Sequence, residues 1–127
     1  MDLFKQVFED KISAGEISEA YVKVTEYTFW HENNKINTSQ KLSINIYQNL
    51  NGQFLYTLSH HYKKSSNAIP YRSSVETKGY DTIEEALKKA KSQLFLHYSE
   101  NDTEAEWVKS PIFNLSIDAT IQTSVPE

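Results

Sequence analysis

The sequence predicts an α+β domain that spans residues 1–127. We expect a mainly antiparallel sheet of four or five strands, one long helix (about 82–98) packed on one face, and a short N-terminal helix. Two observations carry this prediction: a hairpin whose register follows from alternating apolar residues, and a helix with both a start signal and a single apolar stripe. The chain is long enough to form one domain with its own core.

The hairpin is predicted over residues 41–59. Apolar residues alternate in both strands: Leu42, Ile44 and Ile46 in the first, and Phe54, Tyr56 and Leu58 in the second. A two-residue Asn51-Gly52 turn would place these sets on opposite faces, which is costly. A three-residue loop ending at Gly52 instead pairs Ile46 with Tyr56, puts both sets on one face with His60 opposite Leu42, and gives Gly52 a positive φ.

The long helix is predicted to begin near residue 82. Asp81 or Thr82 can accept hydrogen bonds from free amides of the first turn, and a glutamate follows three residues later in either case. The residues that fall within one arc of about 120° are Ile83, Ala86, Leu87, Ala90, Leu94, His97 and Tyr98. Phe95 and Leu96 lie outside this stripe, so we expect the C-terminal segment or a second subunit to cover them.

The remaining elements are predicted from shorter patterns. Asp2 can cap a short helix that ends near Gly15. Residues 20–30 are rich in β-branched and aromatic residues, which predicts a long strand with apolar side chains on both faces. The polar residues 31–40 predict a loop.

Three further segments complete the predicted domain. Residues 71–78 can form a fourth strand that leads into the long helix, and residues 115–121 alternate as expected of a fifth strand. An acidic connector between the helix and this last strand contains Glu100, Asp102, Glu104 and Glu106 and ends at Trp107.

Composition restricts the classes of function. The formal net charge of −4 and the pI of about 5.6 disfavour a general binder of the phosphate backbone. The absence of cysteine excludes disulfides and thiolate chemistry. No apolar run approaches ~18 residues, and the first residues lack the layout of a signal peptide. We therefore expect a soluble, cytoplasmic protein that does not span a membrane.

The sequence contains no motif for a metal, a cofactor or catalysis. His60 and His61 are adjacent in a predicted strand, so their side chains point to opposite faces and cannot hold one metal ion together. The three glycines are isolated, and neither a nucleophile elbow nor a phosphate-cradling loop is present. Glu26 interrupts an apolar side of the first strand and is either a charge at a sheet edge or a group directed at a ligand. We expect no metal, no cofactor and no catalytic residue.

A basic and aromatic group of residues, the predicted anion spot, is the most suggestive feature. It consists of His61, Tyr62, Lys63, Lys64, Tyr71, Arg72 and Ser73. The first four close the third predicted strand and the others open the fourth, so an antiparallel pairing would bring them together. Arg72 is the only arginine, and its planar guanidinium group can hold phosphate or carboxylate at two points. The alternative is a surface strand pair whose cations protect a sheet edge.

One stretch resembles a known family. Residues 75–91, Val-Glu-Thr-Lys-Gly-Tyr-Asp-Thr-Ile-Glu-Glu-Ala-Leu-Lys-Lys-Ala-Lys, follow a predicted hairpin and resemble the strand-to-helix passage of HicB-type antitoxins. The Pro-x-x-Pro-Gly turn that those antitoxins usually carry before this point is absent. The resemblance implies an α+β arrangement only, and no functional residue is carried over.

By elimination, the sequence favours binding over catalysis. We expect a small non-enzymatic regulatory protein, an inhibitor or a sequestering protein, that engages a partner protein or an anionic small molecule. Its sixteen aromatic residues, and the apolar residues on both sides of the first strand, predict a homodimer or a larger homo-oligomer.

Two other classes stay open. A module for single-stranded nucleic acid, although nucleic acid is not the expected partner, would hold the backbone with the cations of the anion spot. Its stacking platforms would be Tyr47, Tyr62 and Tyr71. A small enzyme of unrecognised type would need His60 or Glu26 in a pocket with Arg72.

Overall fold

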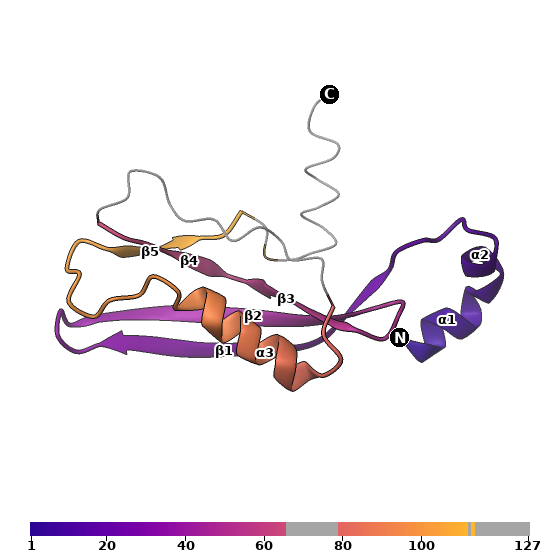
Figure 1. Ribbon diagram of the computed structural model, residues 1–127, viewed down its shortest axis with the longest axis horizontal. Helices are drawn as coiled ribbons and strands as arrows, with labels where there is room; N and C mark the ends of the chain where they lie inside the picture. The colour runs from indigo at the N-terminus through magenta and orange to yellow at the C-terminus, as the bar shows by residue number, and fades with distance from the viewer. Residues whose placement is uncertain (66–78, 112, 114–127) are drawn as a thin grey trace, which may run out of the picture.

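The computed structural model describes residues 1–65, 79–111 and 113, and it has an α+β fold (Figure 1). In chain order, its elements are α1 (Asp2–Val7), α2 (Glu9–Ser13), β1 (Tyr21–Asn33), β2 (Thr38–Asn49), β3 (Phe54–Leu58), β4 (His60–Lys63), α3 (Ile83–Leu94) and β5 (Glu106–Lys109). The predicted α+β class is confirmed. The described strands form two antiparallel sheets rather than one, a three-stranded sheet in the order β1-β2-β3 and a two-stranded sheet of β4 and β5. The strands predicted over residues 71–78 and 115–121 lie outside the described residues.

The β2–β3 hairpin has the predicted register. Ile46 pairs with Tyr56 and Ile44 with Leu58, so the apolar residues of both strands share one face. Gly52 has a φ of +82°, a conformation that glycine adopts without steric cost. The alternation of apolar residues and the position of one glycine were therefore enough to determine this register.

Ser59, the residue between β3 and β4, joins the two sheets. Its amide donates to the carbonyl oxygen of Ser43 at 3.0 Å, and its Oγ accepts from the amide of Ser43 at 2.7 Å. Its own carbonyl oxygen accepts from the amide of Ser110, just beyond β5, at 2.8 Å. Because the chain leaves the first sheet here, His60 pairs with β5, and the prediction that it lies opposite Leu42 is wrong.

The β1–β2 hairpin extends into the segment that was predicted to be a loop. His31 lies opposite Gln40 and Glu32 opposite Ser39, and Ser39 Oγ donates to Glu32 Oε1 at 2.9 Å. The turn itself is confined to the residues between Asn33 and Thr38. The loop prediction was wrong because backbone pairing does not require apolar side chains where a strand pair projects beyond the core.

β1 contains a β-bulge on the outer edge of the described sheet. Its register with β2 changes by one residue between Lys23 and Thr25, which leaves Val24 as the extra residue. The bulge brings Lys23 and Glu26 to one face, where they form an ion pair. The hydrogen bond from Lys23 lowers the pKa of Glu26. Glu26 is therefore a partnered charge on an edge strand, as one of the two interpretations held.

α3 lies across one face of the three-stranded sheet (Figure 1). Its buried residues Ala86, Ala90 and Leu94 belong to the predicted stripe and pack against the apolar face of β2 and β3. Thr82, one of the two predicted caps, accepts a hydrogen bond through Oγ1 from the amide three residues later at 3.1 Å. The helix ends at Leu94, not at residue 98, because the chain turns at Phe95.

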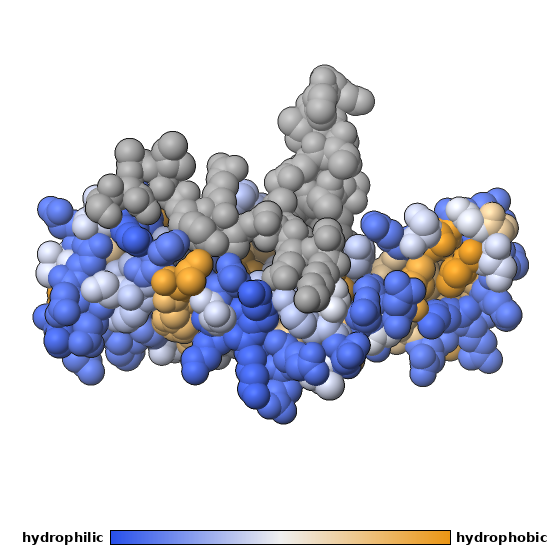
Figure 2. All heavy atoms as spheres, viewed as in Figure 1, coloured by the Kyte–Doolittle hydropathy of each residue, from blue (hydrophilic) through white to orange (hydrophobic). Residues whose placement is uncertain are grey.

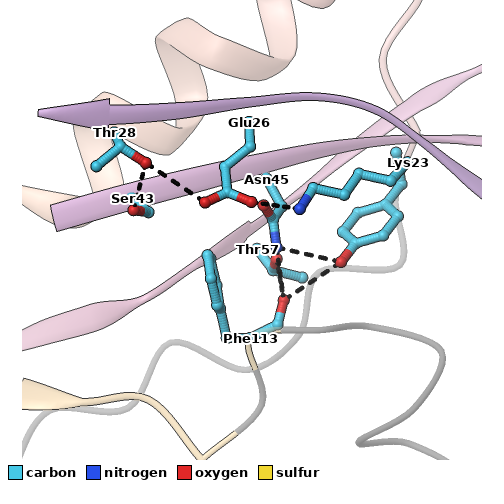
Figure 3. A network of polar contacts seen from close by, with 8 residues as sticks. Lys23, Glu26, Thr28, Ser43, Asn45, Thr57 and Phe113 are labelled. Atoms are coloured by element: carbon cyan, nitrogen blue, oxygen red, sulfur yellow. Dashed lines mark hydrogen bonds and ion pairs between the residues drawn. The ribbon is translucent and has the colours of Figure 1, made fainter.

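On the opposite face of the sheet, Ser43, Asn45 and Thr57 are buried polar side chains, and Figure 3 shows the polar contacts around Asn45. Asn45 is fully buried, and its Nδ2 donates to the Tyr47 hydroxyl and to the Phe113 carbonyl oxygen, both at 3.2 Å. That carbonyl oxygen also accepts from the hydroxyl groups of Tyr47 and Thr57. Asn45 Oδ1 has no hydrogen-bond partner among the described residues. These donors fasten residue 113 to the centre of the sheet.

α1 and α2 form an arm that projects beyond the end of the sheet (Figure 1). The predicted single helix is interrupted at Phe8, whose φ of −106° and ψ of 21° are not helical, and Asp2 lies inside α1 instead of capping it. Neither helix has a buried residue, and Leu3 and Val7 are 74% and 63% exposed. Figure 2 shows the resulting apolar surface on the arm.

Candidate functional site

Five aromatic side chains meet where the β1–β2 hairpin approaches the two-stranded sheet. This aromatic cluster consists of His31, Tyr62, Phe95, Tyr98 and Trp107. Ring centroids are 4.8 Å apart for His31 and Tyr98, 5.0 Å for Tyr62 and Trp107, and 5.8 Å for Phe95 and Trp107. Most pairs are edge-to-face or tilted, the arrangement that the charge distribution of aromatic rings favours.

Local backbone structure places four of the five rings of the cluster. Tyr62 lies directly opposite Trp107 in the β4–β5 pair, so their side chains share one face. Phe95 and Tyr98 are brought round by the turn that ends α3, in which the amide of Tyr98 donates to the Phe95 carbonyl at 3.1 Å. Phe95 therefore packs against the cluster of its own chain. The predicted cover by the C-terminal segment falls largely on residues outside the described ranges, and cover by a second subunit stays a prediction.

A cleft of about 340 Å³ opens beside the aromatic cluster. All members of the cluster except Phe95 line it, together with the end of the β1–β2 hairpin and residues of the acidic connector. Burial raises the pKa of Tyr62 and of Tyr98, so both phenols are neutral in the physiological range. The Tyr62 hydroxyl donates to the Ser99 carbonyl oxygen at 3.0 Å, which fixes this ring in the wall.

Asn33 fastens the acidic connector to the hairpin at one side of the cleft. Its Nδ2 donates to the Glu100 carbonyl oxygen at 3.0 Å, and its Oδ1 accepts from the amide of Lys35 at 3.1 Å. Lys35 also reaches the connector, because its Nζ lies 3.0 Å from Glu100 Oε1. Three residues thus hold together two wall segments that are distant in the sequence.

Asp102 contributes a fixed negative charge to the lining of the cleft. Its Oδ2 accepts from the amide of Ser65 at 3.1 Å, and its Oδ1 from the amide of Glu104 at 3.3 Å. Hydrogen bonds, first from the Ser65 hydroxyl and then from backbone amides, lower the pKa of Asp102, so the carboxylate is ionised at neutral pH. Among the described lining residues there is no lysine or arginine.

The described members of the predicted anion spot, His61, Tyr62, Lys63 and Lys64, differ in burial and in their contacts. His61 and Tyr62 are buried, and Lys63 Nζ lies 3.8 Å from Glu106 Oε1 across the β4–β5 pair. Lys64 is half-buried. The other members, Tyr71, Arg72 and Ser73, lie outside the described residues, so the anion spot stays a prediction.

The structure describes some of the residues on which the two alternative functions, nucleic-acid binding and catalysis, would depend. Tyr47 and Tyr62, two of the three proposed stacking platforms, are buried. His60 shares a hydrogen bond of 2.8 Å between its Nδ1 and Ser59 Oγ, and burial lowers its pKa. In the described part of the chain, no three histidine or carboxylate side chains are grouped so that they could hold a metal ion.

The sequence predicts the acidic connector and Trp107 but contains no local signal for the cleft. The short strand β5 was not predicted because it covers only four residues. No local pattern pairs His31 with Tyr98, because the two rings are brought together by the course of the chain.

No family model, curated protein or solved structure matches this chain. Within the described ranges, none of the helices is long and apolar enough to cross a membrane.

Proposed function

We propose that the protein is a non-enzymatic binding protein that takes a small ligand, or a side chain of a partner protein, into the cleft beside the aromatic cluster. The observation that carries the proposal is the cleft itself. Its volume of about 340 Å³ falls within the range of small-molecule sites, and its lining combines aromatic side chains with polar groups that could orient a ligand. A regulatory or sequestering role in the cytoplasm is part of the same proposal.

The walls of the cleft support this proposal because contacts within the protein hold several of them in place. Tyr62 is fixed through its hydroxyl, Asn33 ties the hairpin to the connector, and Asp102 is held by backbone amides. A site whose side chains are already ordered loses less conformational entropy when a ligand binds. Rigid aromatic rings add contact area at low entropic cost.

Binding in the cleft should be visible at one of the two tryptophans. Trp107 lines the cleft, whereas Trp30 is 63% exposed on β1. In a fragment screen followed by ¹H–¹⁵N NMR, hits should shift the indole N–H signal of Trp107 and leave that of Trp30 unchanged, and Trp30→Phe assigns the two signals. Ala105→Leu, which narrows the cleft, should weaken the hits at least about threefold.

The matched control is Ala14→Leu, because Ala14 is exposed and lies outside the cleft. It should leave the affinity of every hit unchanged. If no fragment shifts the Trp107 signal at millimolar concentration, or if Ala105→Leu and Ala14→Leu bind the hits equally well, the cleft is not a binding site.

The arm supports a second proposal, that the protein self-associates. Leu3 and Val7 are largely exposed, and Phe4 and Phe8 stack on each other with ring centroids 4.6 Å apart. An apolar surface of this kind on a projecting element commonly marks a protein contact. A second copy of the chain would bury this surface, which agrees with the homodimer or larger oligomer expected from the sequence.

Sedimentation velocity tests this self-association. The wild-type chain should sediment as a dimer or larger species at micromolar concentration. Val7→Glu should raise the dissociation constant of this oligomer at least tenfold, because a charge would be buried at the contact. Gln6→Glu adds the same charge at the neighbouring exposed position and should have little effect. A wild-type protein that is monomeric throughout the concentration range would disprove the proposal.

A further inference from the structure

We infer that the ligand of the cleft is an organic cation: an ammonium or guanidinium group carried on an apolar chain. The same chemistry is offered by a free alkylamine and by a lysine or arginine side chain of a partner protein. This inference rests on the proposed function, because it names the ligand class of the same cleft.

The sign of the charge in the cleft is the first argument. Asp102 and Glu106 are among its lining residues, and none of the described lining residues is a lysine or an arginine. Two lysines next in sequence to lining residues are already engaged, Lys35 with Glu100 at 3.0 Å and Lys63 with Glu106 at 3.8 Å. An anion would therefore enter next to an ionised carboxylate without a lysine or arginine among the described lining residues.

The geometry of Asp102 is the second argument. The amides of Ser65 and Glu104 and the Ser65 hydroxyl donate to this carboxylate, and these bonds orient it and keep it ionised. None of these donors carries a charge, so the negative charge of the group is not neutralised by them. Among the described residues, no lysine, arginine or histidine forms an ion pair with Asp102. A cationic ligand would supply the counter-charge that this carboxylate lacks there.

The aromatic wall is the third argument. Tyr98 and Trp107 line the cleft, and both are only partly buried. Aromatic faces attract cations through their quadrupole, and they also accept the methylene groups that carry an ammonium or guanidinium group. An anion gains nothing from these faces, and a neutral ligand gains only the apolar contact.

Three probes of the same chain length separate these possibilities: butylammonium, 1-butanol and butyrate. Each is titrated into the full chain while the Trp107 indole signal is followed by NMR. Butylammonium should bind at least about three times more tightly than 1-butanol, as expected for one exposed charge, and butyrate should bind most weakly. Raising the salt concentration from about 10 to 300 mM should reduce the affinity for butylammonium only.

The carboxylate is tested by a matched pair of variants. Asp102→Asn should remove most of the preference for butylammonium over 1-butanol, whereas Glu104→Gln, which removes a charge from the same connector outside the cleft lining, should keep it. Thermal melts of both variants check that they fold. If Asp102→Asn does not fold, the salt dependence of the wild-type protein decides whether charge drives binding.

The source of the cation is distinguished by two peptides, acetyl-Gly-Lys-Gly-amide and its norleucine counterpart. Tighter binding of the lysine peptide than of butylammonium indicates a side chain of a partner, and the reverse indicates a free amine.

Three results would overturn the inference: equal binding of butylammonium and 1-butanol, tightest binding of butyrate, or an unchanged preference for butylammonium in folded Asp102→Asn. If fragments shift Trp107 but no cationic probe does, only the ligand class fails; if nothing shifts it, the proposed function fails as well.

Discussion

Replacing Leu94 with alanine should lower the free energy of unfolding by about 2 to 5 kcal/mol. Leu94 is 1% exposed and forms the end of the α3 stripe that packs on β2 and β3. The two other buried residues of this stripe are alanines, so Leu94 is its only large fully buried side chain. Truncating it removes apolar contacts and leaves a cavity that the sheet cannot close without moving. Urea denaturation followed by circular dichroism measures the loss.

Leu96 provides the matched control for Leu94. It is two positions further along the chain but 49% exposed, so Leu96→Ala should lower the free energy of unfolding by less than about 1 kcal/mol. Equal losses of unfolding free energy in the two variants would mean that α3 does not pack on the sheet in the described orientation.

Asn45→Asp should lower the free energy of unfolding, and the size of this loss should depend on pH. The side chain keeps its size, but it loses the amide that donates to the Tyr47 hydroxyl and to the Phe113 carbonyl oxygen. The introduced carboxyl group is fully buried beside that carbonyl oxygen, so its pKa in the folded state should rise well above its unfolded value of about 3.9. At pH 7, the variant should be about 3 to 4 kcal/mol less stable than the wild type.

The direction of the pH effect follows from this raised pKa. Below about pH 3.9, the introduced carboxyl group is protonated in both states, so its charge costs nothing. As the pH rises, the unfolded chain loses the proton first, and the difference from the wild type should grow by about 1.4 kcal/mol per pH unit until the folded pKa is reached. Urea denaturation of both proteins at about pH 3.5, 5 and 7 measures the difference.

Asn34→Asp is the control for this series, because Asn34 is exposed in the β1–β2 turn. Its stability should differ from that of the wild type by less than about 0.5 kcal/mol at each pH. A difference for Asn45→Asp that stays constant between pH 3.5 and 7 would contradict the description of Asn45 as a fully buried side chain.

The parts of the fold that depend on local signals could be predicted from the sequence. The register of the β2–β3 hairpin follows from alternation and from Gly52, and the start of α3 follows from Thr82. In both cases the residue types that specify the structure are close together in the chain, so no tertiary information is needed.

The parts that depend on distant contacts could not be predicted. The helical pattern continues through Tyr98, but α3 ends at Leu94 and Tyr98 packs against His31 and Trp107 instead. The candidate cleft lies among these same contacts. The environment of Asn45 could not be predicted either, because this buried side chain is bonded to Phe113, a residue far along the chain.

Ser59 has a consequence for how the protein unfolds. This one residue donates to Ser43 in the three-stranded sheet and accepts from Ser110 beside the two-stranded sheet. Its side chain also takes part, since Oγ accepts from the Ser43 amide. Separating either sheet therefore removes hydrogen bonds that help to hold the other. The two sheets belong to one cooperative unit, and the walls of the cleft between them are lost together rather than one at a time.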